Sequence, residues 1–377
     1  MLSLILLSAG ESSRFQLPIK KQWLRVGKNP LWLDVLNRFE SLNIFSKIIL
    51  TAHKDEVSLF KNFTDIEIIV GGETRQKSIK NAISKIETDY VMISDIARCL
   101  IPEDMLDRLI SNIHFGDVIV PYLPVSDTVV FGQDSINRDM VKLIQTPQIS
   151  KTKILKKLLQ NDKEFTDESS LFVANGFQRF FVLGDKKADK LTYIQDVTSS
   201  SCFKKPVDEK IVIGNGFDVH QFEIDGSPLK LGGIEIKTPL TFKAHSDGDV
   251  LIHSLIDSIL GASGIGDIGD MFPDNDEKYK GADSSELLKY VKNLITKIGL
   301  QIEHIDITVM AEIPRLKNYK MEIRKKLSEI LDIQKSSVNI KATTTEKLGF
   351  IGRKEGVAVL TTATLKYVNW KEFLNGV

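Results

Sequence analysis

The sequence predicts two joined domains of the α/β class, and three observations support this. The chain has 377 residues, more than one typical domain, and 42% of them are hydrophobic, which suffices for two cores. Along the first half, short apolar runs alternate with helical patterns, which is typical of a mainly parallel sheet covered on both faces. A polar stretch without clear periodicity, Ser199–Lys210, then breaks this alternation. We therefore expect one domain over residues 1–205 and a smaller α+β domain over residues 206–377.

Each expected element follows from its hydrophobic period and its flanking residues. In the first domain we expect strands at Leu2–Leu7, Lys47–Thr51, Ile66–Val70, Tyr90–Ser94, Val118–Val120 and Phe180–Leu183. Its expected helices are Leu31–Ser41, Thr74–Ile86, Pro102–Ser111 and Thr152–Leu159. In the second domain we expect strands at Lys210–Gly214, Ile305–Met310, Val338–Ala342 and Val357–Tyr367. Its expected helices are Asp247–Leu260, Ser284–Ile298 and Asn318–Leu331.

Composition narrows the class of function. Lys+Arg and Asp+Glu both number 50, so the net charge is zero, and neither a nucleic acid nor a membrane surface is an expected partner. The apolar run Leu4–Leu7 is too short for a signal peptide, and no segment approaches the length that spans a bilayer. Two cysteines without paired spacing, Cys99 and Cys202, argue against a disulfide framework and indicate a reducing, cytoplasmic setting.

Loops that follow apolar strands indicate phosphate binding in the first domain. The strand Leu2–Leu7 runs into SAGESSRFQLPIKKQ, where Gly10 permits close backbone approach and cations follow. This loop matches neither a P-loop nor G-x-G-x-x-G, so a plain strand-to-helix turn stays open. A second glycine turn, GGETRQKSI, brings Arg75 and Ser78 to a helix start. Asp95 ends an apolar strand, where an aspartate commonly holds Mg²⁺ on nucleotide phosphates.

The order of the first-domain motifs resembles the 2-C-methyl-D-erythritol 4-phosphate cytidylyltransferase family over nearly all of residues 1–200. The motifs are SAG with Arg14, Lys21 and Gln22, then GGETRxxS, SDxAR, PVSDT, QTPQ and FTDESS. The resemblance implies a Rossmann-like nucleotidyltransferase in which methylerythritol phosphate attacks the α-phosphorus of CTP and expels pyrophosphate. It also implies that Arg14 and Lys21 stabilise the transition state, while Arg138 and Lys190 hold the attacking phosphate.

The same resemblance implies substrate contacts and shows three departures. The implied contacts are Ser8, Ala9, Gly10, Gly71, Arg75, Ser78, Asp95, Ala97, Thr146, Thr166 and Asp167. The run PIKKQ leaves Lys20 as an alternative to Lys21, although its place beside Gln22 favours Lys21. Cys99 replaces the proline of the family's Ala-Arg-Pro, and DTVV lacks the lysine that usually follows Asp-Thr. FTDESS by itself is also the signature of a helix cap.

Two segments of the second domain predict a metal site with three protein ligands. If Ile211–Phe222 is extended, its two-residue spacing puts Asp218 and His220 on one face. In the stretch AHSDGDVLIHSLIDSILG, His253 lies at the edge of an apolar helix face. Each part has an ordinary explanation, because a DxH pair is often incidental and such a histidine is often structural. Ser246 followed by Asp249 resembles a capping box with Asp in place of Glu, so Asp249 is expected to cap the helix. Together, however, two histidines and a carboxylate leave a fourth tetrahedral position open, as in catalytic zinc sites.

The second-domain motifs closely resemble 2-C-methyl-D-erythritol 2,4-cyclodiphosphate synthase over about residues 210–370. They are FDVHxF, HSDGDVxxH, GDIG, FPD and KATTTEKLGFxGR. The resemblance implies zinc on Asp218, His220 and His253, with His245 and Thr344 as transition-state stabilisers and Glu346 on Mg²⁺. The implied substrate contacts are Ser246, Asp267, Ile268, Gly269, Phe272, Pro273, Asp274, Asp276, Ala311, Pro314, Thr343, Thr345, Glu346, Phe350 and Arg353.

Together the resemblances imply a bifunctional isoprenoid-precursor enzyme with Zn²⁺ in the second domain and Mg²⁺ in both. In the second reaction, the substrate's 2-phosphate would attack the β-phosphorus of its CDP group and expel CMP. A separate kinase, with which the chain could associate, would act between the two steps. The families imply a trimeric second domain, a dimeric first domain, and hence a hexamer or larger assembly. Two alternatives stay open: a sugar nucleotidyltransferase fused to a zinc phosphohydrolase, and a nucleotide-binding regulatory module with structural zinc.

Overall fold

A computed structural model of the chain describes residues 1–161, 163–224, 227–243, 247–273, 275–276, 279 and 281–376. Its contacts divide the chain into two compact units. The first unit contains Met1–Val207 and Lys371–Val377, and the second contains Asp208–Trp370. The sequence assigned the final segment to the second domain, but Lys371 Nζ donates to the carbonyl of Lys205, 2.7 Å away, within the first unit. In the described residues, no helix combines the length and apolar character needed to cross a membrane.

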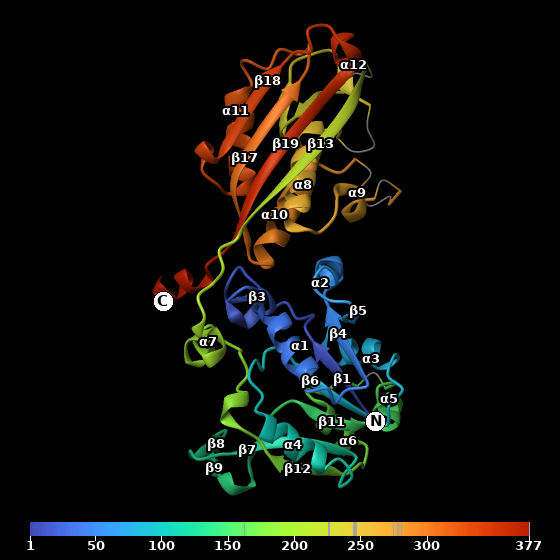
Figure 1. Ribbon diagram of the computed structural model, residues 1–377, viewed down its shortest axis with the longest axis vertical. Helices are drawn as coiled ribbons and strands as arrows, with labels where there is room; N and C mark the ends of the chain where they lie inside the picture. Colours follow the sequence, from blue (N-terminus) through green and yellow to red (C-terminus); the bar gives the residue numbers. More distant parts are fainter. Residues whose placement is uncertain are drawn as a thin grey trace. The chain divides into compact units, whose positions relative to one another are not determined.

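An eight-stranded sheet forms the centre of the first unit (Figure 1). Its order is β10-β7-β11-β6-β1-β4-β5, with β12 beside β7. The four strands β5, β4, β1 and β6 run parallel, whereas β11 pairs antiparallel with both β6 and β7. The strands are β1 (Leu2–Leu7), β4 (Lys47–Ala52), β5 (Glu67–Val70), β6 (Tyr90–Asp95), β7 (Val118–Pro124), β10 (Lys142–Ile144), β11 (Gln148–Lys151) and β12 (Arg179–Leu183).

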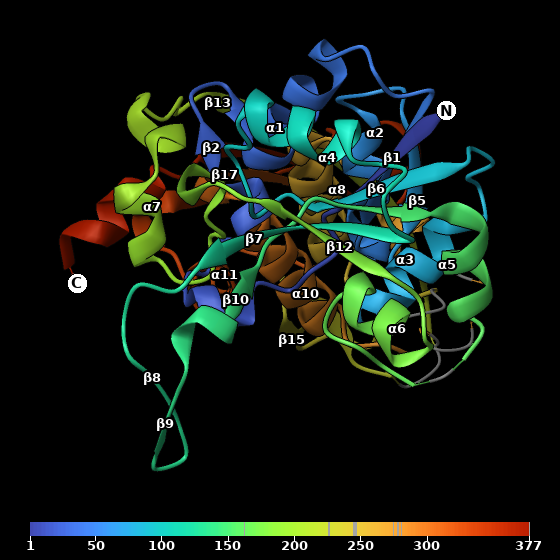
Figure 2. The ribbon, with the colours of Figure 1, turned by 90° about the horizontal axis from the view of Figure 1, so that it is seen from below.

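Helices cover both faces of this sheet, as the sequence predicts (Figure 2). All six residues of β1 are buried, which explains why this strand is apolar apart from Ser3. Side chains of α3, α5 and α6 share one core cluster with β1, β4 and β6, and α1 and α4 lie on the other face. The helices are α1 (Leu31–Ser41), α2 (Val57–Lys61), α3 (Arg75–Ile83), α4 (Glu103–Ser111), α5 (Thr152–Leu158), α6 (Glu168–Ala174) and α7 (Gln195–Ser199).

Short elements connect the sheet strands of the first unit. Two hairpins consist of β2 (Arg25–Val26) with β3 (Asn29–Pro30), and β8 (Val129–Phe131) with β9 (Asp134–Ile136). The single-turn 3₁₀ helices are η1 (Ser13–Phe15), η2 (Lys21–Trp23), η3 (Lys54–Glu56), η4 (Arg138–Met140), η5 (Lys186–Ala188) and η6 (Ser201–Lys204). The sequence does not predict β10, β11 or the β8–β9 hairpin, because these segments are short and mixed in polarity.

The second unit is an α+β sandwich of a five-stranded sheet and helices. The sheet order is β16-β13-β19-β17-β18, and among the described strands only β17 and β18 pair in parallel. Its strands are β13 (Ile211–Glu223), β16 (Thr241–Phe242), β17 (Leu300–Met310), β18 (Val338–Thr343) and β19 (Gly356–Tyr367), beside the hairpin β14 (Leu229–Leu231) with β15 (Ile234–Ile236). The helices are α8 (Val250–Ser263), α9 (Ile268–Met271), α10 (Ser284–Lys297), α11 (Lys320–Leu331) and α12 (Gly349–Gly352). Two further 3₁₀ segments are η8 (Lys335–Ser337) and η9 (Trp370–Gly376).

Two glycines let helix α8 lie directly on strand β13. A Cβ atom added at Gly216 would stand 1.9 Å from the carbonyl oxygen of Ser254, and one at Gly214 would stand 2.2 Å from that of Ser258. Any larger residue would therefore push the helix away from the strand. The strand extends to Glu223, well beyond the predicted end at Gly214, and so carries the DxH pair past this contact.

Candidate active sites

The loop after β1 is fixed by its own side chains. The buried Gln22 donates through Nε2 to the carbonyl of Gly10 at 3.0 Å and accepts from the Ser12 hydroxyl at 3.2 Å. The backbone N–H of Lys21 donates to the same hydroxyl oxygen, 3.1 Å away. These bonds join the start of the loop to its end without the glycine-rich sequence of a P-loop.

The structure distinguishes the two adjacent lysines that the sequence left as alternatives. Lys20 is buried, and its Nζ pairs with Oε1 of Glu56 at 2.6 Å and with a second glutamate. Lys21 instead donates through Nζ to the carbonyl of Leu191 at 3.3 Å. Burial and the nearby cation Lys190 lower the pKa of Lys21 to about 8. Lys20 is therefore neutralised inside the protein, which supports Lys21 as the cation available to substrate.

Asp95, at the end of β6, brings three of the first-domain motifs together. Its Oδ1 accepts from Arg75 Nε at 3.1 Å, and its Oδ2 accepts from Lys190 Nζ at 2.7 Å. Arg75 also forms an ion pair with the buried Glu168. Burial acts to raise the pKa of Asp95, but Arg75 and Lys190 outweigh it and hold the pKa below its usual range. A carboxylate and two cations thus form one charged cluster at the carboxyl edge of the parallel strands.

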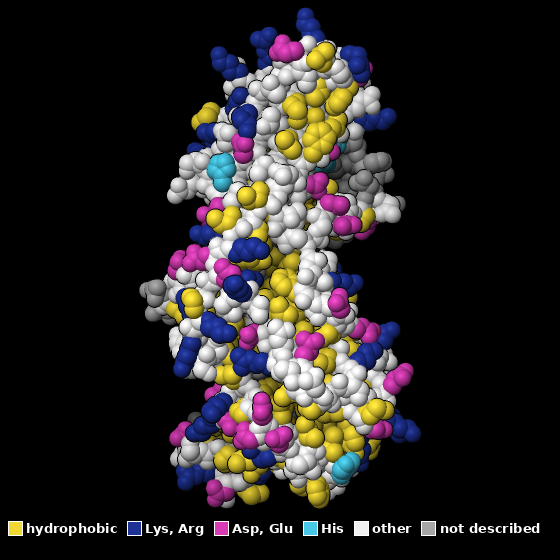
Figure 3. All heavy atoms as spheres, viewed as in Figure 1, with side chains coloured by type: hydrophobic (Ala, Val, Ile, Leu, Met, Phe, Trp, Pro, Cys, Tyr) yellow, Lys and Arg dark blue, Asp and Glu magenta, His cyan; other side chains and the backbone are white. Residues whose placement is uncertain are grey.

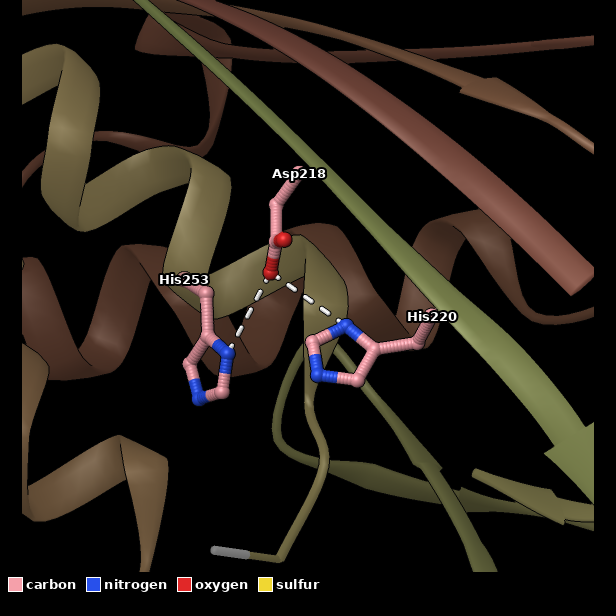
Figure 4. Close-up of side chains that lie close together, drawn as sticks. All are labelled: Asp218, His220 and His253. Carbon is pink, nitrogen blue, oxygen red and sulfur yellow. Dashed lines mark ion pairs between the residues drawn. The ribbon is translucent and has the colours of Figure 1, made fainter. Parts of the chain in front are cut away.

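In the second unit, Asp218 and His220 of β13 and His253 of α8 point toward one another (Figure 4). Asp218 Oδ2 lies 3.3 Å from His220 Nδ1 and 3.3 Å from His253 Nδ1. Ligand atoms bound at 2.0–2.2 Å around a tetrahedral zinc stand roughly 3.3–3.5 Å apart, so the two spacings fit such an ion. The buried His220 Nδ1 makes no hydrogen bond within the described residues. Asp218 Oδ2, 3.3 Å away, is its ion-pair partner, and a metal ion bound between these atoms would satisfy both.

The imidazole of His253 is held from its other side. Its Nε2 lies 3.0 Å from the hydroxyl of the buried Ser284, which in turn donates to Oδ1 of Asp247. Oδ2 of Asp247 accepts from Lys230 Nζ and from the Ser284 N–H, each at 3.2 Å. When the Nε2 proton is bonded to Ser284, the Nδ1 lone pair is the ligand atom that would bind a metal. This arrangement fits the proposed donor set.

Comparisons with known proteins identify the family. Residues 2–204 match the model of 2-C-methyl-D-erythritol 4-phosphate cytidylyltransferase, and residues 211–366 match that of the YgbB family. The bifunctional enzyme IspD/IspF of Sulfurimonas denitrificans is 53% identical over 98% of this chain and 95% of its own length. The chain belongs to the bifunctional IspD/IspF family.

Further relatives agree with this assignment. The bifunctional IspD/IspF enzyme of Campylobacter jejuni strain 81-176 is 48% identical over 98% of each chain. A solved structure of the bifunctional IspDF from Campylobacter jejuni matches with a TM-score of 0.83 and 47% identity, over 98% of this chain and 99% of that one. The chain thus has two activities, a cytidylyltransferase and a cyclodiphosphate synthase, in the non-mevalonate isoprenoid pathway. It acts on small-molecule substrates.

Other residues expected in the IspD site lie around the same sheet edge. Ala9 and Gly71 touch, because a Cβ at Gly71 would stand 2.3 Å from that of Ala9. The Ser78 hydroxyl accepts from the N–H of Gly72 at 3.0 Å, and the carbonyl of Ala97 accepts from Leu191 N–H at 2.9 Å. The remaining expected residues of these loops are Ser8 and Gly10 after β1, and Thr146, whose hydroxyl accepts from Arg98 Nε at 2.8 Å.

Four residues expected in the IspD site do not belong to the charged cluster around Asp95. Arg14, in η1, is exposed, and its charge contributes to the low pKa of Lys21. Arg138, in η4, is exposed and donates to the carbonyl of Ser126 at 2.6 Å. Within the described residues, no hydrogen bond or ion pair joins Arg138 to Asp95, Arg75 or Lys190. Asp167, which follows Thr166, caps α6 through the Ser170 N–H at 3.1 Å, as the capping signature indicated.

Asp249 caps a helix, but not in the predicted way. Its carboxylate accepts from the N–H groups of Ile252, Gly232 and Gly233 at 3.0, 2.8 and 2.7 Å. Asp249 is thus itself the N-cap of α8, rather than the third residue of a capping box that begins at Ser246. The helix starts at Val250 because the cap precedes it, not at Asp247.

The other expected IspF-site residues form two groups. The first group follows α8, where Asp267 caps α9 and precedes Ile268 and Gly269. The Ile268 N–H donates to Asp257. Phe272 packs on Tyr279. Pro273 and Asp276 follow in this segment, while His245, Ser246 and Asp274 lie outside the described residues. At the ends of β17 and β18, Ala311 N–H donates to the Thr343 carbonyl at 3.0 Å, and Thr344 Oγ1 donates to Glu346 at 3.0 Å. The nearby loops also hold Pro314, Thr345, Phe350 and Arg353, with Arg353 paired to Glu355 at 2.9 Å.

Sequence reasoning missed three side chains of these sites. Glu168 belongs to the FTDESS motif, and its acidic side chain beside Asp167 was a signal for a partner of Arg75. Asp247 lies in HSDGD, between residues that were named. Ser284 offers no sequence signal, because it stands 31 positions from the histidine it contacts.

Proposed function

We propose that residues 1–205 carry out cytidylyl transfer at the Asp95 cluster and that residues 206–377 carry out cyclisation at Asp218, His220 and His253. The observation that supports this division is that each unit gathers a different kind of charged site. The first joins Lys21, Asp95 and Lys190 from distant segments, and the second joins two histidines with a carboxylate. Cations suit a reaction in which negative charge builds up on a phosphoryl group.

In the first reaction, we assign the stabilisation of the α-phosphoryl charge to Lys21 and Arg14. Lys190 and Arg138 would hold the phosphate of methylerythritol phosphate as it attacks in line. The low pKa of Asp95 keeps its carboxylate ionised, and a carboxylate oxygen is the donor that Mg²⁺ prefers. Bound Mg²⁺ would neutralise charge on the CTP phosphates. Asp95 would be its protein ligand, while Arg75 and Lys190 keep the carboxylate oriented.

In the second reaction, we assign Asp218, His220 and His253 as zinc ligands and Glu346 as a ligand for Mg²⁺. Bound in this way, the two ions would neutralise and polarise the phosphates of the CDP substrate. Ser284 orients His253, and the Thr344 hydroxyl, now on Glu346, would turn to the diphosphate together with His245. Asp267–Gly269, Phe272–Asp276, Phe350 and Arg353 would hold the methylerythritol and diphosphate groups. Ala311, Pro314, Thr343 and Thr345 would meet the cytidine.

We assign the phosphorylation between these steps to a separate kinase, because the first product lacks the 2-phosphate that the second reaction uses.

We further propose that the chain forms a homo-oligomer. Ile213, Phe217 and Val219 of β13 and Leu360 of β19 are exposed, and Figure 3 shows hydrophobic side chains gathered over these strands. The β8–β9 hairpin also exposes Phe131 and Ile136 and extends away from its sheet (Figure 2). These surfaces suit a trimeric second unit and a dimeric first unit. A cytoplasmic setting is a prediction that rests on the cysteine content.

Two assays test the proposed sites separately. With CTP, Mg²⁺ and methylerythritol phosphate, the purified chain should release pyrophosphate, and Lys21→Ala should lower the rate of release to a small residual value that is still measurable. With CDP-methylerythritol 2-phosphate, mass spectrometry should find the cyclic diphosphate and CMP, and Lys21→Ala should leave this reaction intact. If CMP appears without a cyclic product, the second unit is a phosphohydrolase rather than a cyclase.

A further inference from the structure

A buried glutamate outside the motifs contacts the loop that carries Lys21. Glu56 ends η3, in the segment after β4, and only 1% of its side-chain surface is exposed. Its Oε1 pairs with Lys20 Nζ at 2.6 Å, and its Oε2 accepts from the indole N–H of Trp23 at 2.7 Å. Both carboxylate oxygens are therefore used by residues of one short stretch of chain.

The two partners of Glu56 lie on either side of the proposed catalytic Lys21 in the sequence. Lys20 precedes Lys21 directly, and Trp23 follows it after one residue. The Trp23 ring is itself anchored, because its centroid lies 4.8 Å from that of Phe60. The hydroxyl of Ser12 accepts from the Lys21 N–H at 3.1 Å. Ser12 thus holds the backbone of Lys21, Glu56 holds the side chains of its neighbours, and the Lys21 amine is directed to the carbonyl of Leu191.

We propose that Glu56 is a positioning residue for cytidylyl transfer. By binding Lys20 and Trp23 at once, it fixes the turn of η2 and so the direction in which Lys21 presents its amine. This inference rests on the proposed role of Lys21. A well-placed cation gains its effect from fixed geometry, and a small displacement lowers the rate of transfer strongly.

The chemistry of the contact favours a positioning role over a purely stabilising one. A buried ion pair adds little net stability, because taking two charges out of water offsets their attraction. Packed apolar residues would fill this place at least as well, as Trp23, Trp32 and Phe60 do beside it. What an ion pair adds is a fixed direction, since the carboxylate binds two donors at defined angles.

A double-mutant cycle distinguishes the two roles. The variants are Glu56→Gln, Lys21→Ala and both together, assayed for kcat and KM with CTP and methylerythritol phosphate. We expect Glu56→Gln to lower kcat about tenfold and to change KM for CTP less than about twofold, because substrate binding is left in place. In the Lys21→Ala background, Glu56→Gln should cause no further loss, since it acts through Lys21. Losses that multiply, or an unchanged kcat in Glu56→Gln, would overturn the proposal.

Controls keep the test decisive. Cyclisation by the same chain should be unchanged in every variant, which confirms the concentration of folded second unit. Glu87→Gln, an exposed change in the first unit, should keep wild-type cytidylyl transfer. If Glu56→Gln does not fold because the buried Lys20 loses one of its two carboxylate partners and keeps Glu11, Lys20→Met/Glu56→Gln removes both charges of the pair together and keeps an acceptor for Trp23. A fully active double variant would overturn the proposal, whereas full activity of Lys21→Ala would instead refute the proposed role of Lys21.

Discussion

Ser284→Ala should weaken zinc binding by the second unit without unfolding it. In the native chain, the Ser284 hydroxyl stands between His253 Nε2, 3.0 Å away, and the carboxylate of Asp247. Alanine removes the partner of the imidazole N–H on the side that faces away from the metal. Asp247 would still be satisfied, because it keeps Lys230 and the N–H of residue 284.

The expected magnitude follows from that one lost bond. Without metal, His253 can protonate either nitrogen, but a metal on Nδ1 forces the proton onto Nε2, where it would have no buried partner. An unsatisfied buried donor costs about 1–3 kcal/mol, and this cost falls on the metal-bound state. It corresponds to roughly a 5- to 140-fold higher Kd for zinc, which brackets the 10- to 100-fold loss usual when a contact behind a metal-binding histidine is removed.

The assay is a zinc titration of metal-free protein against a chelator of known affinity, with a melting curve recorded for each variant. Ser258→Ala is the matched control, because Ser258 is also buried and lies on the same helix as His253. Among the described residues, its hydroxyl bonds only to the Leu255 carbonyl at 2.7 Å. A Kd within about twofold of wild type for Ser284→Ala would refute the reasoning, as would an equal loss in the control.

Three further predictions concern pH, metals and a helix cap. Because burial and Lys190 lower the pKa of Lys21 to about 8, its charge is lost as the pH rises through that value, so kcat/KM for CTP should fall above about pH 8. In Lys21→Arg, which stays protonated, any such fall should shift to higher pH, and an unshifted profile would contradict the assignment. Treatment with a chelator should stop both reactions. Zn²⁺ with Mg²⁺ should then restore CMP release, Mg²⁺ alone should restore pyrophosphate release, and cyclisation that resists the chelator would argue against zinc. Asp249→Ala leaves three backbone N–H groups without their acceptor, so the unfolding free energy of the second unit should drop by about 3 kcal/mol in urea titrations, and a change below about 0.5 kcal/mol would contradict this.

Much of the fold could be predicted because its signals are local. The run Leu2–Leu7 has to be buried on both faces, and in the structure all six residues are. Strand β13 was predicted only to Gly214, since alternating exposed and buried residues after that point weaken its apolar signal. Strand β11 was missed because a four-residue antiparallel strand carries no period that separates it from a loop.

The candidate sites, like the fold, were predictable where their signals are local and not where they depend on distant segments. The sequence by itself determined the two phosphate chemistries, because the types of ligand and cation and their spacing are written in short motifs. Only the tertiary structure decided which of Lys20 and Lys21 is neutralised, since Glu56 lies 36 positions from Lys20. It also decided that Ser284 supports His253 and that Glu168 binds Arg75. The physical reason is that a side chain's charge and direction depend on its partners in space, and those partners come from distant segments that leave no periodic trace in the sequence.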